Sequence, residues 1–126
     1  MREQLLKSIL DDLNDSSTDI DGCAIISSDG LTIMAQLPEG VDENRVGALA
    51  AATLSLGERT AVELERGELD QVMIKGAGGY ILMSHAGRDA VLTIIAREGA
   101  KLGLIFLDAK RAAKNILEVL SDDDHE

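Results

Sequence analysis

The chain has 126 residues, of which 45% are hydrophobic, and this length fits one compact domain with no room for a second core. Its 12 basic and 23 acidic residues give a net charge of −11, which argues against a nucleic-acid partner. The uncharged stretch 46–57 is too short to span a bilayer, so we expect no direct membrane insertion. Cys23 is the only cysteine, so an internal disulfide and a thiolate zinc site are excluded, and we expect a reducing, cytoplasmic location.

The N-terminal part of the chain predicts a helix and then a β-hairpin. Apolar residues recur at helical spacing from residue 2 to about 14, which predicts an amphipathic helix. Two apolar runs, 23–26 and 31–34, then flank Ser-Ser-Asp-Gly at 27–30. An Asp-Gly pair between apolar runs is a strong hairpin signal, so these runs are the first two predicted strands.

A long helix is predicted in the middle of the chain. Asp42 can cap its N-terminus, and apolar residues follow at helical spacing from Val46 onward. Gly67 is a helix stop, so we expect the helix to end at about Arg66.

Three further strands and a last helix are predicted in the second half. The runs 69–75 and 80–85 are joined by a glycine-rich turn and form a second hairpin. The run 90–96 is apolar on both alternating faces, which indicates a central strand covered on both sides. Helical spacing from Ile105 to Leu120 predicts the last helix.

This order of elements predicts an α+β fold in which an antiparallel sheet lies between helical layers. We divide the chain into a single domain, residues 1–121, and an acidic, solvated tail, residues 122–126.

The middle helix is apolar on two sides. One stripe consists of small residues and leucine, Gly47, Ala50, Ala51, Leu54, Gly57 and Ala61; the second is larger, Val46, Leu49, Thr53, Leu56, Thr60 and Leu64. One sheet can bury only one stripe, so we expect a homodimer in which the small stripe contacts its symmetry mate. Burial of the whole helix inside one monomer is the alternative. Val72 and Ile74, in an edge strand that needs a partner, complete the predicted dimer interface.

No residue pattern indicates catalysis. His85 has no catalytic partner at a recognised spacing, the glycines at 76–79 lack a phosphate-loop ending, and Cys23 lies in an apolar strand without a nearby cation. We therefore predict a protein that is not an enzyme and has no cofactor and no bound metal. A hydrolase that uses His85 and Asp89 is an alternative.

Several segments together resemble the roadblock dynein light-chain family. They are Asp-Gly-Cys-Ala-Ile-Ile-Ser-Ser-Asp-Gly at 21–30, Gly-Gly-Tyr-Ile-Leu-Met at 78–83, Gly-Arg-Asp-Ala-Val-Leu-Thr-Ile-Ile at 87–95, and Leu-Gly at 102–103 leading into Arg-Ala-Ala at 111–113. The resemblance implies a profilin-like α-β-β-α-β-β-β-α domain with five antiparallel strands, the middle helix on one face and the terminal helices on the other. It also implies dimers whose third strands pair edge to edge and whose middle helices pack side by side.

The resemblance further implies a homodimeric, non-enzymatic regulator or scaffold for a small Ras-like GTPase. Stimulation of GTP hydrolysis, simple scaffolding, and a heterodimer with a paralogue all stay open. Arg45, Glu58 and Arg59 are the predicted partner contacts, and Arg45, Arg59 or Arg66 could supply a guanidinium to the GTPase, although a solvated helix face explains them more simply. The alternative function is a small-ligand sensor with a pocket between sheet and helices.

Overall fold

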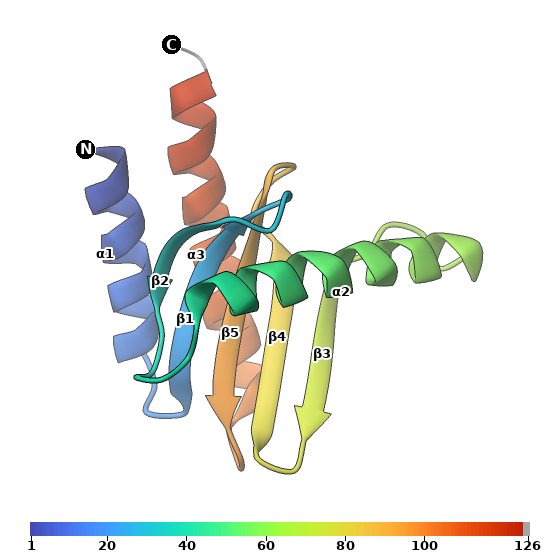
Figure 1. The fold of residues 1–126 in the computed structure, drawn as a ribbon, viewed down its shortest axis with the longest axis horizontal. Coiled ribbons are helices and arrows are strands. Elements are labelled where there is room, and N and C mark those ends of the chain that lie inside the picture. The colour runs from blue at the N-terminus through green and yellow to red at the C-terminus, as the bar shows by residue number, and fades with distance from the viewer. Residues whose placement is uncertain (125–126) are drawn as a thin grey trace.

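The structure is a computed structural model that describes residues 1–124, with side chains described as far as Ser121. It contains a five-stranded antiparallel sheet and three helices in the predicted order (Figure 1). The elements are α1 (Arg2–Asp15), β1 (Ile20–Ser27), β2 (Thr32–Gln36), α2 (Glu43–Glu63), β3 (Gln71–Gly76), β4 (Gly79–His85), β5 (Ala90–Arg97) and α3 (Leu102–Asp124).

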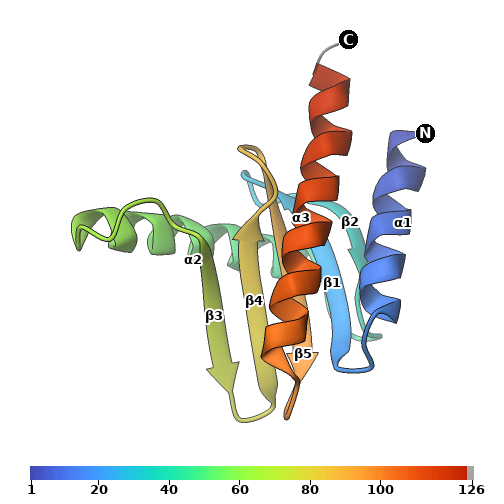
Figure 2. The same ribbon diagram turned by 180° about the vertical axis from the view of Figure 1, so that it is seen from behind.

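The sheet has the strand order β2-β1-β5-β4-β3, so the doubly apolar β5 is central, as predicted. Helix α2 crosses one face of the sheet, while α1 and α3 lie on the other face (Figures 1 and 2). The predicted α+β fold with its helical layers is therefore confirmed. No helix in the described part of the chain is long and apolar enough to cross a membrane.

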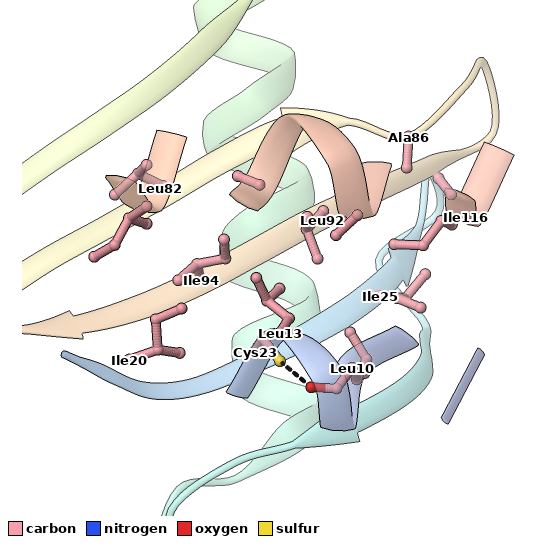
Figure 3. Close-up of a cluster of buried hydrophobic side chains, with 14 of the residues drawn as sticks. Leu10, Leu13, Ile20, Cys23, Ile25, Leu82, Ala86, Leu92, Ile94 and Ile116 are labelled. Atoms are coloured by element: carbon pink, nitrogen blue, oxygen red, sulfur yellow. Dashed lines mark hydrogen bonds between the residues drawn. The ribbon is translucent and has the colours of Figure 1, made fainter. Parts of the chain in front are cut away.

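The larger core lies between the sheet and the pair α1 and α3. Leu6 and Leu10 from α1, Leu92 from β5, and Ile105 and Ile116 from α3 are at most 1% exposed. Figure 3 shows these layers meeting around Leu92 and Leu10. Since helical spacing in α1 and α3 and alternation in β5 bring these residues together, the sequence periodicity accounts for this core.

Helix α2 begins as predicted and ends three residues early. The Asp42 side chain accepts a hydrogen bond from the Asn44 amide at 2.9 Å, which confirms the N-cap. At the other end Glu65 has a φ of 58°, and the Arg66 amide bonds back to the Ala61 carbonyl at 2.7 Å. This arrangement is a Schellman ending. The helix stops before Gly67 because Glu65 already takes the left-handed conformation directly after the cap; Gly67, with a φ of 87°, lies beyond the end of the helix.

Helix α3 extends farther than predicted. The backbone stays helical through Asp124, so the first three residues of the predicted acidic tail, 122–124, continue the helix. The sequence has no glycine or proline after Leu120 that would end it. Residues 125–126 of the predicted tail lie outside the described residues.

Candidate interaction surface

Helix α2 covers only part of its face of the sheet. It lies over one end of the strands, and its C-terminal part projects beyond β3 (Figure 1). Beneath it, Ala50 and Leu54 form a small core cluster with Ile26, Met83 and Val91. The sheet surface beyond this cluster is apolar and remains accessible to solvent, as the next residues along β3 and β4 show.

Ile74 and Ile81 form the accessible part of this face. They are cross-strand partners in β3 and β4, and their side chains are 42% and 36% exposed. Ile81 also pairs with the half-buried Ile95 of β5, so the three isoleucines make a row across three strands. We call Ile74, Ile81 and Ile95 the isoleucine row.

The small-residue stripe of α2 faces the sheet of its own protomer, which corrects its predicted place in a dimer interface. Ala50 and Leu54 are 3% and 2% exposed. A Cβ at Gly47 would lie 2.5 Å from the Gly30 carbonyl oxygen, and one at Gly57 would lie 2.8 Å from Val72. Gly47 and Gly57 therefore permit close contact with the sheet. The partly buried Ala51 and Ala61 complete the same stripe.

The larger stripe carries the leucines that α2 leaves in solvent, whereas its Val46 packs against the small cluster under the helix. Leu49, Leu56 and Leu64 are 61%, 64% and 64% exposed. This stripe was recognised in the sequence, but the helical projection did not reveal which of the two stripes meets the sheet. Close packing decides the matter, because glycine and alanine let the α2 backbone approach the strands more closely than leucine does.

β3 is an edge strand, as expected. Within it, Val72 packs toward α2 beside Gly57, whereas Ile74 lies in the exposed isoleucine row. Val72 is thus engaged inside the protomer, and Ile74 remains available for an interface. An edge with exposed apolar residues needs protection against pairing with other chains.

The predicted partner contacts have different surroundings. The Glu58 carboxylate lies 2.7 Å from His85 Nε2, which ties α2 to the end of β4. Arg59 forms an exposed ion pair with Glu63 at 3.0 Å, and Arg45 is exposed in the first turn of α2. An exposed helical ion pair is weak and easily exchanged, so Arg45 and Arg59 are accessible to a partner, whereas Glu58 already has a local one.

The structure does not join His85 and Asp89 as a catalytic pair. His85 binds Glu58, while the Asp89 backbone carbonyl accepts a hydrogen bond from the Ser28 amide at 3.1 Å. Of the residues that the structure describes, no three His, Cys, Asp or Glu side chains are grouped so that they could hold a metal ion.

Cys23 lies in the core between β1 and α1. Its thiol is 3.6 Å from the Leu10 carbonyl oxygen and 3.4 Å from Asn14 Oδ1, and Figure 3 marks the contact with Leu10. Burial raises the pKa of the Cys23 thiol to about 12, with a smaller contribution from the negative charge of Asp11. A thiol of this kind stays protonated and is unsuited to nucleophilic attack.

The comparisons with known proteins agree with this fold. Residues 6–96 match the model of the Roadblock/LC7 domain. An uncharacterized protein of Methanocaldococcus jannaschii, MJ1340, is 40% identical over 112 residues, which cover 89% of this chain and 96% of that protein.

Two solved structures of MglB share the fold. The first, described as MglB with a tetrameric arrangement, has a TM-score of 0.89 at 18% identity and covers 96% of this chain and 91% of its own. The second, Myxococcus xanthus MglB, has a TM-score of 0.87 at 18% identity, with coverages of 95% and 90%. The sequence match, the relative and the element order together lead to one conclusion: the chain belongs to the Roadblock/LC7 domain family.

Proposed function

We propose that the chain acts as a homodimer that binds a Ras-like GTPase, as its regulator or scaffold, with no catalytic site of its own. The observation that carries the proposal is the half-covered α2 face. Leu49 and Leu56 on the helix and Ile74 and Ile81 on the sheet are exposed together, next to the open edge of β3. Several large apolar side chains exposed on one side of a sheet are expected at a protein interface.

A second protomer, related to the first by a two-fold axis perpendicular to the sheet and beside β3, would cover this surface. Antiparallel pairing of β3 with its twin joins the two sheets and keeps both α2 helices on the same face. Because α2 covers one end of its own strands and projects beyond β3, the partner's α2 would lie over the opposite end (Figure 1). That end carries the isoleucine row.

The larger stripe of α2 points in the direction that this arrangement requires. Glu58 contacts His85 at the C-terminal end of β4. At 100° per residue the larger stripe is centred roughly 100° around the helix from the buried Leu54, on the side away from Glu58 and nearer the start of β4 and Ile81. Leu64 faces this side, and Leu49 and Leu56, about 140° and 160° from Leu54, lie between it and the outer surface of the helix. The stripe therefore borders the place that the second α2 would occupy.

The choice of a GTPase as the partner rests on the family resemblance. The exposed outer surface of α2 is the proposed docking site. Arg45 and Arg59 project from this surface without being buried. A dimer that recognises nucleotide-dependent segments must bind the GTP and GDP forms unequally, since only differential affinity can shift the switch. Arg45 is the better candidate for a stabilising guanidinium, because Arg59 is paired with Glu63.

The assembly is tested by light scattering on the wild type, Leu56→Glu and Leu31→Glu. The wild type should have twice the 13.4 kDa chain mass at micromolar concentration, and Leu56→Glu should be monomeric. Leu31, 68% exposed in the β1–β2 turn, is the matched control and should leave the dimer intact. A monomeric wild type would refute the dimer.

The partner is tested by calorimetry against a Ras-like GTPase from the same organism, loaded with a non-hydrolysable GTP analogue or with GDP. We expect at least a ten-fold preference for one form, about 1.4 kcal/mol, and a loss of affinity in Arg45→Ala. A turnover assay then separates a stimulator from a scaffold. Equal affinity for both forms would remove the regulatory role.

A further inference from the structure

A groove lies on the opposite face of the sheet, between α3 and the strands β3 and β4. Its volume is about 440 Å³, and its lining includes Gln71 and Ser84 on the strands and Phe106, Leu107 and Lys110 on α3. Figure 2 shows α3 on this face with no helix over β3. Leu107 is 62% exposed, so the groove has an apolar wall in contact with solvent.

The strand register extends the floor of this groove toward the other end of β3. Met73 pairs with Leu82, and Lys75 pairs with Tyr80. Alternation along β3 places Met73 and Lys75 on the face opposite Val72 and therefore on the α3 side. Met73 is 44% exposed, and the Lys75 ammonium lies 5.9 Å from the centre of the Tyr80 ring.

The charge of the groove differs from that of the chain. Lys75 lies toward one end of the floor, Lys110 lines the helical wall, and Lys114 follows one turn later on the same side of α3. The acidic residue in the lining is Asp70. In and beside the groove, Lys75, Lys110 and Lys114 outnumber the carboxylates of Asp70 and of Glu118, which lies one turn beyond Lys114. In a chain of net charge −11, this local excess of lysine suits an acidic ligand.

The proposed dimer would join two such grooves across its two-fold axis. From β5 of one protomer to β5 of the other there are five strand spacings, about 24 Å. Since α3 packs on β5 in each protomer, and a helix is about 10 Å wide, roughly 14 Å would remain between the two α3 helices. That width admits one further helix.

We propose that the paired grooves form one trough that binds a single amphipathic, acidic helix of another protein. The inference rests on the proposed dimer. Apolar side chains of the bound helix would rest on Met73, Phe106 and Leu107, and its carboxylates would meet the lysines of both protomers. A second copy of the same trough is a poor occupant, because it would bring lysines against lysines.

The test uses two synthetic helical peptides of about 18 residues, some 27 Å long. Both carry leucine at helical spacing; one has glutamate and the other lysine at the remaining positions. In calorimetry with the full chain, the glutamate peptide should bind at one per dimer and at least ten-fold more tightly than the lysine peptide. Equal binding of the two peptides, or two peptides per dimer, would overturn the proposal.

Variants locate the binding site. Leu107→Asp and Lys110→Glu should each lower the affinity for the glutamate peptide at least ten-fold. Leu31 is exposed in the β1–β2 turn, so Leu31→Asp should leave this affinity unchanged. Unchanged affinity in Leu107→Asp would place the peptide elsewhere and refute the trough.

The same samples separate this inference from the proposed function. A dimer that binds the GTPase but neither peptide would refute the trough alone. A monomeric wild type would refute the dimer and the trough together. Because the trough and α2 lie on opposite faces of the sheet, Lys110→Glu should bind the GTPase like the wild type.

Discussion

The two faces of the sheet are covered by helices and buried to different degrees. On the α1 and α3 face, sixteen buried residues from both helices and the central strands form one cluster. On the α2 face, the buried cluster has six residues, and Ile74 and Ile81 beside it stay exposed. The first face supplies most of the stabilising burial within one chain.

Polar contacts occur on both faces, and on the α2 face Glu58 contacts His85 at 2.7 Å. Asp19 joins β1 to Arg97 at the end of β5 and to the Lys101 amide just before α3. On the α2 face, the Thr93 hydroxyl is buried without a hydrogen-bond partner in the described part of the chain. A domain whose stability comes mainly from one face can keep the other face available for binding.

The largest effect on stability is expected from truncating a core side chain on the α1 and α3 face. Leu92→Ala, at a side chain 1% exposed in the central strand, should lower the free energy of unfolding by about 2–5 kcal/mol. Leu54→Ala should fall at the lower end of that range, because the smaller cluster under α2 borders an open surface and can relax. Urea unfolding at one protein concentration measures both.

Leu31→Ala is the control for this pair. Its side chain is 68% exposed, so the change should stay within about 0.5 kcal/mol. A cost for Leu54→Ala equal to that for Leu92→Ala would contradict the difference between the faces.

A second pair of variants tests how closely α2 fits the sheet. Gly47→Ala gains about 1 kcal/mol of helix propensity, but its Cβ would overlap the Gly30 backbone, and overpacking costs about 1–3 kcal/mol. Since a backbone oxygen cannot rotate away, we expect net destabilisation. Gly103→Ala in α3 has open space around its Cβ and should be stabilising by up to about 1 kcal/mol. A Gly47→Ala variant that melted at a higher temperature than the wild type, as Gly103→Ala should, would mean that α2 packs loosely on the sheet.

The Asp19 contacts predict a pH dependence of stability. The hydrogen bond from the Lys101 amide and the bonds from Arg97 hold the pKa of Asp19 below its ordinary value of 3.8. A lowered carboxyl pKa contributes stability above the unfolded pKa, and that stability is lost as pH falls through the folded pKa.

Asp19→Asn should therefore lower the Tm at neutral pH, and the difference from the wild type should shrink as pH falls below 3.8. Melting curves across this range measure the effect. A constant difference at every pH would assign the loss to packing rather than to ionisation.

The smallest effect is expected at Cys23. With a pKa of about 12, its thiol should resist a thiol reagent at mildly alkaline pH in the folded protein and react fully in denaturant. Cys23→Ala should reduce stability by about 1 kcal/mol and leave partner binding unchanged. Rapid labelling of the folded protein would show that the α1 and α3 face opens readily.

The sequence alone predicted the elements and their order. The Asp-Gly turn, the Asp42 cap and the doubly apolar β5 are local signals, and each produced the expected hairpin, helix start or central strand. The end of α2 was misplaced because Glu65 adopts a conformation for which glycine is the usual residue.

Only the tertiary structure decided what each face of α2 contacts and where the surfaces for partners lie. Periodicity records that a side of a helix is apolar, but it does not tell which apolar side meets the sheet. That choice depends on distant residues: Gly30 against Gly47, and Val72 against Gly57. The groove beside Leu107 depends likewise on where α3 sits across the strands, which is set by side-chain packing between segments far apart in the chain.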